Sequence, residues 1–149
     1  MKLVIGSDHG GFDAKESLVR VLRQDGHDVL DVGPSNEDST DYPDYAAVVG
    51  RAVAGRKAER GFLLCGTGIG MCIAANKIRG VRAAVVWSKE TAALASEHNG
   101  ANVLCLGGRV LSKPQIIAFA RIWLASSFHG GRHLRRVKKI MALEKGGKR

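Results

Sequence analysis

The sequence predicts an α/β protein: a three-layer α/β/α sandwich around a five-stranded parallel sheet of the Rossmann-like kind. Short apolar runs alternate along the chain with longer segments that carry helical periodicity. Such alternation favours parallel strands joined by right-handed crossovers. The runs are almost continuously hydrophobic, which is typical of strands covered by helices on both faces of a sheet.

The first strand and helix lie at the N-terminus. Residues 3–5 are apolar and are followed by Gly6, so we expect a strand there. Residues 12–24 are expected to form a helix, because its apolar residues share one face; these are Leu18, Val21 and Leu22. Gly26 suits the C-terminal cap of this helix, since glycine adopts the left-handed conformation without strain.

The second unit contains the longest expected loop. Residues 29–32 form another largely apolar run and are expected to be a strand. Residues 33–44 are polar and include Pro34 and Pro43, so they are predicted to form a loop. Residues 45–55 are rich in Ala and Val and are expected to form a short helix.

Three further units complete the predicted fold. The expected strands are residues 61–65, 83–87 and 103–106, and the helices that follow them are residues 69–78, 89–97 and 113–125. Beyond them, apolar residues recur at helical spacing at positions 134, 137, 140 and 141. We therefore expect a basic C-terminal helix at residues 130–145.

Length and composition indicate one globular domain, spanning residues 1–149, with 45% hydrophobic and 25% charged residues. No apolar run reaches the ~18 residues of a membrane span, so no membrane association is expected. The N-terminus carries no signal-peptide pattern. The three cysteines are odd in number and lack CxxC spacing, which favours a reduced, cytoplasmic protein over a disulfide scaffold or zinc site.

Positive charge is concentrated at the C-terminus. The formal net charge is +9, and residues 129–149 contain eight Lys or Arg and one acid. Such a tail can be a solvated helix face, a phosphate-binding arm or a nucleic-acid contact. Arg132 and Arg136 are four residues apart, so they share a helix face where two guanidinium groups suit a phosphate dianion. Aromatic residues are only 5% of the chain, which argues against a nucleic-acid partner.

Chemistry-bearing residues follow three of the predicted strands. Residues 8–11 follow the first strand, residues 65–70 the third and residues 107–109 the fifth. Ligands of open parallel sheets bind beyond the carboxyl ends of the strands. We therefore expect these three clusters, with Arg109 in the last, to meet at one edge of the sheet.

The glycine-rich loop after the third strand predicts an anion site. Gly66, Gly68 and Gly70 leave room for backbone N–H groups to turn inward near a helix start. Met71 and Ile73 break the dinucleotide-binding pattern, and no Gly-Lys-Ser/Thr follows as in a Walker A loop. The alternative is a tight strand-to-helix turn with no ligand.

Cys65 stands at the edge of this loop. A thiolate at a helix N-terminus is stabilised, so Cys65 is a candidate base, although a buried small hydrophobe is the commoner fate of a free cysteine. Cys72 and Cys105 lack this setting and are expected in the core. The Thr67 hydroxyl lies in the same loop, with a helix N-cap as its alternative role.

Asp8-His9 and His98-Asn99 pair an acid or an amide with an imidazole. Asp8 and His9 can cap the first helix, bind sugar hydroxyls or move protons. His98 ends a helix just before the fifth strand, so it is predicted at the sheet edge opposite Cys65. If Cys65 and His98 serve the same site, a second subunit supplies one of the two residues. The alternative is that His98 interacts only with the carbonyl groups at the end of its helix.

Together these clusters resemble the family that ribose-5-phosphate isomerase of the B type shares with galactose-6-phosphate isomerase. The likeness covers nearly the whole chain. The motifs that carry it are residues 6–12 (GSDHGGF), 41–43 (DYP), 65–70 (CGTGIG), 74–77 (AANK), 98–99 (HN), 102–104 (NVL), 107–109 (GGR) and 130–133 (GGRH) with Arg136.

The resemblance implies an isomerase of phosphorylated sugars that needs neither metal nor cofactor, working in the pentose phosphate pathway. It implies that Cys65 moves a proton between C1 and C2 and that His98 opens the furanose ring with help from Asp8 and Tyr42. Some members have another residue in place of this cysteine, so Cys65 favours the ribose-phosphate branch.

The resemblance also assigns the binding residues. The N–H groups of residues 66–70 (Gly66, Thr67, Gly68, Ile69, Gly70) would hold the enediolate, with Thr67 shuttling hydroxyl protons. The substrate and phosphate ligands would be His9, Asn99, Arg109, Arg132 and Arg136. Members are homodimers or tetramers with sites between subunits. An isomerase of six-carbon sugar phosphates (galactose or allose 6-phosphate) and a non-enzymatic phospholigand or nucleic-acid binder are the alternatives.

Overall fold

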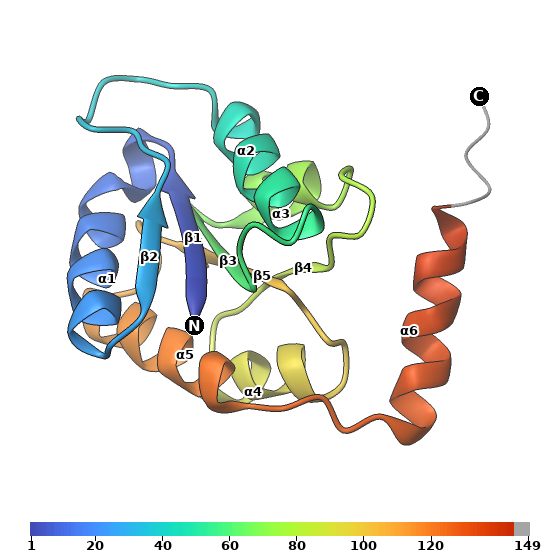
Figure 1. Ribbon diagram of the computed structural model, residues 1–149. Coiled ribbons are helices and arrows are strands. Elements are labelled where there is room, and N and C mark those ends of the chain that lie inside the picture. The colour runs from blue at the N-terminus through green and yellow to red at the C-terminus, as the bar shows by residue number, and fades with distance from the viewer. Residues whose placement is uncertain (145–149) are drawn as a thin grey trace.

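The computed structural model describes residues 1–144, and its centre is one parallel sheet in the strand order β2-β1-β3-β5-β4 (Figure 1). The strands are β1 (Lys2–Ser7), β2 (Asp28–Asp31), β3 (Arg60–Cys65), β4 (Ala83–Val85) and β5 (Val103–Gly107). The helices are η1 (His9–Gly11, a 3₁₀ turn), α1 (Phe12–Gln24), α2 (Tyr42–Ala54), α3 (Ile69–Ala75), α4 (Lys89–Glu97), α5 (Lys113–Ala125) and α6 (Gly131–Leu143). The predicted five-stranded parallel α/β fold is confirmed.

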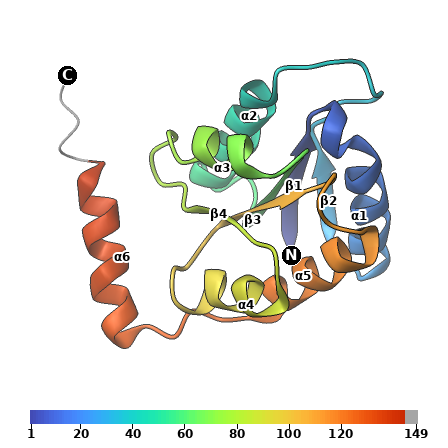
Figure 2. The ribbon, with the colours of Figure 1, turned by 180° about the vertical axis from the view of Figure 1, so that it is seen from behind.

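Helices cover both faces of the sheet. Helices α1, α4 and α5 lie on one face and α2 and α3 on the other, as the view from behind also shows (Figure 2). Alternate residues of β3 serve the two cores: Phe62 and Leu64 pack toward α1 and α5, while Leu63 and Cys65 pack toward α2 and α3. This alternation follows from the period of two along a strand, and it explains why the strands have no polar face.

The sequence prediction misplaced the start of α2. Residues 42–44 were expected in the loop, but α2 begins at Tyr42 with Pro43 in its first turn. Proline is tolerated there because the first N–H groups of a helix have no intrahelical partner. Tyr42 is therefore fixed on a helix. Helix α3 ends at Ala75 rather than residue 78, and β4 ends at Val85 rather than residue 87.

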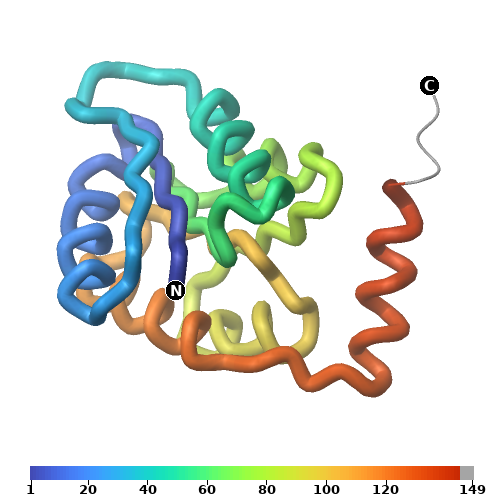
Figure 3. The backbone as a smooth tube through the Cα atoms, viewed as in Figure 1, coloured from blue at the N-terminus to red at the C-terminus, as the bar shows by residue number. Residues whose placement is uncertain are grey.

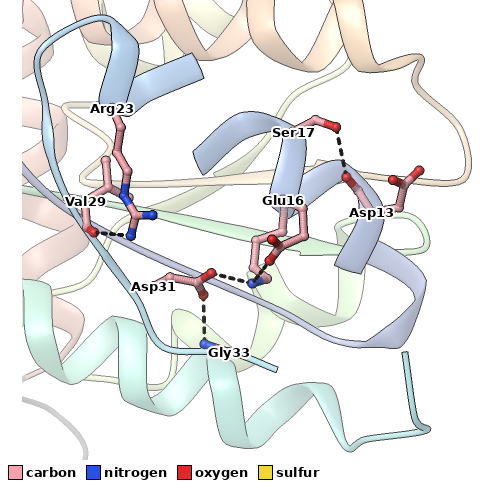
Figure 4. A network of polar contacts seen from close by, with 8 residues as sticks. Asp13, Glu16, Ser17, Arg23, Val29, Asp31 and Gly33 are labelled. Atoms are coloured by element: carbon pink, nitrogen blue, oxygen red, sulfur yellow. Dashed lines mark hydrogen bonds and ion pairs between the residues drawn. The ribbon is translucent and has the colours of Figure 1, made fainter. Parts of the chain in front are cut away.

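A buried ion pair anchors the loop after β2. Lys15 is 1% exposed and its Nζ contacts Asp31 Oδ2 at 2.5 Å and Glu16 Oε1 at 2.7 Å. Figure 4 shows that Asp31 also accepts a hydrogen bond from Gly33 N, at 2.9 Å. Gly33 in turn accepts from Ser7 N at 3.0 Å. The network therefore holds the loop against the carboxyl end of β1.

Helix α6 projects away from the domain, as the backbone tube shows (Figure 3). Of its residues only His133 is buried, and the apolar side chains of Leu134 and Ile140 are 42% and 47% exposed. Its C-terminal end is attached through Glu144, whose Oε1 accepts from Gly80 N at 2.9 Å. The predicted helix at residues 130–145 is thus present, while position 145 and the predicted fraying of residues 146–149 lie outside the described residues.

None of the helices described within residues 1–144 combines the length and the hydropathy needed to cross a bilayer.

Candidate active site

The three predicted clusters meet at the carboxyl edge of the sheet. Backbone hydrogen bonds tie them together: Gly108 N donates to Cys65 O at 2.7 Å, Arg109 N to Gly66 O at 3.0 Å, and Asp8 N to Leu64 O at 3.1 Å. The parallel register, which pairs Cys65 with Gly107, places these loops side by side. The prediction of a common edge is confirmed.

Glycine is required where these loops touch. A Cβ on Gly11 would lie 2.5 Å from the carbonyl carbon and oxygen of Leu64, and one on Gly108 would lie 2.9 Å from Gly10 O. These contacts are to backbone atoms, which cannot move aside without breaking the sheet edge. The loops therefore approach closely only because these residues have no side chain.

Cys65 lies beneath the glycine loop. It is 5% exposed, and its Sγ accepts a hydrogen bond from Gly68 N at 3.1 Å. Gly68 adopts φ +80°, the left-handed conformation that turns the chain from β3 into α3. An N–H that points at a sulfur atom interacts best with the thiolate form.

Several N–H groups of the loop are available for a ligand. Those of Gly66, Thr67 and Gly70 donate no hydrogen bond to any residue of the described chain. The other two are engaged: Gly68 N by the Cys65 sulfur and Ile69 N by Thr67 Oγ1, at 3.3 Å. The loop thus has three free donors of the five predicted, close to a buried thiol, which is an arrangement that receives negative charge on oxygen.

The Thr67 hydroxyl accepts from Ile69 N, but the N-cap residue of α3 is Gly68, so the alternative role of Thr67 as the N-cap is wrong. The side chain is exposed, so the hydroxyl proton is free to be donated outward.

Tyr42 lies against the same loop. A Cβ on Gly70 would be 2.7 Å from Tyr42 Cζ and 3.0 Å from its Oη, so the phenol covers Gly70 closely. The ring is 40% exposed. Helix α2 therefore brings a phenolic hydroxyl next to the glycine loop.

Asp8 and His9 follow β1 at this edge. Asp8 is 7% exposed, and its Oδ1 caps η1 by accepting from Gly11 N at 3.1 Å. His9 Nδ1 accepts from Thr40 N at 3.3 Å. Because Nδ1 is the acceptor, the neutral ring carries its proton on Nε2, which is the atom left to donate to a ligand.

Arg109 lies over the same two loops. A Cβ on Gly10 would be 3.3 Å from Arg109 Cζ, and one on Gly66 would be 3.5 Å from its Nη1. The guanidinium group therefore extends across the glycine loops next to the free N–H groups. Its planar donors suit a carboxylate or phosphate oxygen at that point.

The remaining predicted residues lie elsewhere. His98 caps the C-terminus of α4, near the amino end of β5, where Val103 pairs with Gly61. Gly61 and Cys65 are four residues apart on β3, about 13 Å at ~3.3 Å per residue. His98 and Asn99 are thus at the opposite edge, as predicted. Arg132 and Arg136 are on α6, so one chain contains two separate halves of the predicted site.

The second half has a feature that sequence reasoning missed. The His98 and His133 rings stack with centroids 4.1 Å apart and planes 9° from parallel. The pKa of His133 is lowered from 6.5, first by burial and then by the positive charge of His98, Arg132, Arg136 and His129. His133 directly follows Arg132 in the GGRH motif, so the sequence did contain a signal for it. Its stacking partner, His98, lies 35 residues earlier in the chain.

The two other cysteines behave differently from each other. Cys105 is fully buried, and burial raises the pKa of its thiol. Cys72 was expected in the core, but it is only half-buried, and hydrogen bonding from Cys105 lowers its pKa to about 7. The expectation for Cys72 holds in part, because its side chain packs against the core between the sheet and α2 and α3 but stays partly exposed. Cys72 is therefore a partly exposed thiol of lowered pKa on the α3 side of the sheet.

Comparisons with known proteins find relatives that match nearly the whole chain. The profile of the Ribose/Galactose Isomerase family matches residues 3–140. Ribose-5-phosphate isomerase B of Escherichia coli is 43% identical over 143 residues, covering 96% of each chain. The structure of Clostridium thermocellum ribose-5-phosphate isomerase B has a TM-score of 0.97 and 44% identity, covering 98% of this chain and 99% of that chain.

A further solved structure has a ligand. It is ribose-5-phosphate isomerase B from Mycoplasma genitalium with bound ribulose-5-phosphate, which has a TM-score of 0.93 and 43% identity and covers 96% of this chain and 95% of that chain. At this identity and coverage, sequence and fold agree along nearly the entire chain. The chain belongs to the ribose/galactose isomerase family.

Proposed function

We propose that this protein interconverts ribose 5-phosphate and ribulose 5-phosphate, as an aldose–ketose isomerase acting through an enediolate. Membership of the family and the ribulose-5-phosphate bound to the Mycoplasma genitalium relative support this substrate. Within the chain, the observation that carries the proposal is Cys65 beneath a loop with three free N–H groups. A base beside oxyanion donors is what proton transfer next to a carbonyl requires.

The proton steps follow from this arrangement. The Cys65 thiolate removes the proton from C2 of the open aldose, and the electrons move onto O1. The loop N–H groups stabilise that charge; loss of one such donor costs ~3–4 kcal/mol in a well-studied enzyme. Thr67 moves the hydroxyl proton between O2 and O1, and Cys65 returns its proton to C1, which gives the ketose. No proton is gained or lost overall.

Ring opening must come first, because the furanose has no carbonyl. His98 donates a proton to the ring oxygen while the Asp8 carboxylate, with Tyr42 assisting, takes the proton of the C1 hydroxyl. His9 and Asn99 bind hydroxyl groups. The guanidinium groups of Arg109, Arg132 and Arg136 bind the phosphate, whose binding energy orients the reacting carbons.

This division of roles needs two subunits. Cys65 and His98 are at opposite sheet edges, and Arg132 and Arg136 lie on α6 close to His133, which stacks on His98. We propose a homodimer, or a tetramer built from two such dimers, in which His98, Asn99, Arg132 and Arg136 of one subunit complete the Cys65 site of the other. The exposed apolar side chains of α6, Leu134 and Ile140 among them, would be buried in that contact.

A substrate panel with chelator present tests the function. We expect kcat/KM to be highest for ribose 5-phosphate and lower for allose 6-phosphate and galactose 6-phosphate. Higher efficiency on a six-carbon substrate would replace the pentose assignment while leaving the isomerase chemistry intact. Retained activity with chelator would support catalysis by the protein's own groups.

The base is tested by a matched pair of cysteine variants. Cys65→Ala should lower kcat by roughly 10²–10⁴-fold, the usual contribution of a positioned base. Cys72→Ser removes the partly exposed thiol, whose pKa is about 7, and should leave kcat near the wild-type value. Wild-type turnover in Cys65→Ala, or its loss in Cys72→Ser, would contradict the assignment.

A further inference from the structure

A group of metal-ligand side chains lies outside the glycine-loop site. Glu97 and His98 end α4, and His129 precedes α6; one ligand atom from each lies within 4.8 Å of the other two. Glu97 Oε2 and His129 Nε2 are 3.8 Å apart. Around a tetrahedral zinc ion with bonds of about 2.0–2.1 Å, ligand atoms are roughly 3.4 Å apart. Small side-chain rotations therefore suffice to close the three ligands on one ion.

The backbone holds these ligands together without a metal. His129 N donates to Glu97 O at 3.0 Å. The segment before His129 is also fixed to α4, because Ser96 Oγ donates to Ser126 O at 2.7 Å. Arg60 adds bonds to Trp123 O at 2.6 Å and Ser126 O at 3.3 Å. The entropy of bringing His129 to α4 is thus lost on folding rather than on metal binding.

The His98 ring is held in place as well. It stacks on His133 with planes 9° from parallel, which restricts rotation of the imidazole. His129 is 56% exposed, and Glu97 is 26% exposed, so an ion can reach the cluster from solvent. The arrangement leaves a fourth position for water.

The ligand set selects the ion. Two imidazoles and one carboxylate suit Zn²⁺ and the neighbouring transition metals, whereas Mg²⁺ and Ca²⁺ prefer oxygen ligands. Arg132 and Arg136, close enough to His133 to lower its pKa, add positive charge near the cluster and weaken binding of a dication. We therefore expect weaker binding than at the same ligand set without these two positive charges.

We propose that Glu97, His98 and His129 form an inhibitory site for a zinc-class divalent ion. An imidazole nitrogen that coordinates the ion cannot donate a proton, so occupation removes the acid that opens the sugar ring. The inhibitory effect rests on the proposed role of His98, but the binding site does not. The ion takes no part in the isomerisation itself.

Binding is measured directly on the metal-free full-length protein, by calorimetry with zinc sulfate. We expect one ion per subunit in the wild type and at least a 10-fold weaker affinity in His129→Gln. The matched control is His27→Gln, which removes a histidine near the N-terminus. Equal zinc affinity in the wild type and His129→Gln would overturn the site.

The cysteines are the competing zinc ligands, and Co²⁺ distinguishes them. Cobalt at the proposed site should give visible absorption without a thiolate-to-metal charge-transfer band, and Cys65→Ser and Cys72→Ser should bind it as the wild type does. A charge-transfer band that disappears in either cysteine variant would place the metal on sulfur and refute the proposal.

Activity provides the separate test of inhibition. Zinc should inhibit the wild type, chelator should restore turnover, and His129→Gln should keep its basal activity but lose the zinc sensitivity. Zinc binding that depends on His129 but leaves turnover unchanged would retain the site and contradict His98 as the ring-opening acid. No isomerase activity on any sugar phosphate, with binding intact, would refute the proposed function alone.

Discussion

His98 and His133 stack face to face, 4.1 Å between ring centroids, although one ends α4 and the other begins α6. The contact joins the projecting helix to the domain beside the predicted ring-opening acid. The stack therefore places one buried imidazole, that of His133, at the base of α6. The pKa of His133 is lowered there, first by burial and then by the positive charge of His98.

The free energy of unfolding should fall as pH decreases below about 6.5. The folded-state pKa of His133 is lowered from 6.5, first by burial. Between the folded and unfolded pKa values the unfolded chain binds more protons, so stability is present above 6.5 and is lost as pH falls through the folded pKa. Urea denaturation at a series of pH values from 7.5 down to 5 measures this change in the free energy of unfolding.

His133→Phe should flatten that pH dependence, because phenylalanine keeps the stacking area but does not titrate. His27→Phe is the control, since it removes a histidine that contacts the N-terminal amine instead. An unchanged pH profile in His133→Phe would show that acid sensitivity arises elsewhere.

Gly70→Ala should destabilise the protein, although alanine is the better helix former. The added Cβ would lie 2.7 Å from Tyr42 Cζ, and such overpacking typically costs about 1–3 kcal/mol. In a Tyr42→Ala background the collision is gone, so Gly70→Ala should stabilise the protein by about 0.5–1 kcal/mol through helix propensity. A double-mutant cycle by urea denaturation gives both values. Equal effects in the two backgrounds would mean that the phenol does not cover Gly70.

Two inactive variants should restore activity when combined. In a mixed dimer of Cys65→Ala and His98→Ala subunits, one shared site has both defects and the other has both wild-type groups. Random mixing should therefore recover about one quarter of wild-type activity for a two-fold symmetric dimer. The assay follows turnover after co-expression or co-refolding of the two variants. If the complete site lay within one chain, mixing would recover nothing.

Asp31→Ala should destabilise the fold more than removal of its partner does. This substitution leaves the ammonium of Lys15, which is 1% exposed, with only the half-exposed Glu16 as a partner. We expect the free energy of unfolding to fall by about 2 kcal/mol, a value discounted because Asp31 is 24% exposed. Lys15→Met removes the buried charge and should stay within about 1 kcal/mol of the wild type.

The exposed pair of Lys113 and Asp13 is the control for that series. Its side chains are 47% and 68% exposed, so Lys113→Met should change stability by less than ~1 kcal/mol. If Lys15→Met were as damaging as Asp31→Ala, the ion pair itself would be the stabilising element.

Much of the fold could be predicted from the sequence, because its determinants are local. Helices 12–24, 89–97 and 113–125 were predicted with their observed bounds, and the structure shows capping boxes at Ser88 and Ser112 where the last two begin. The glycine loop and Cys65 were also predicted, because a strand, a glycine run and a helix start are adjacent in the chain. Pro43 misled the prediction of α2, since the same residue is compatible with a loop and with a first helical turn.

The sequence by itself determined the parallel α/β sheet, the carboxyl-edge location of Cys65 and the opposite-edge location of His98. Only the tertiary structure placed Tyr42 on Gly70, opened one side of Cys72 and stacked His133 on His98. Strand and helix signals depend on neighbours within one or two turns, whereas these contacts join side chains far apart in the chain. Their existence depends on packing angles and burial, which no local pattern of residues records.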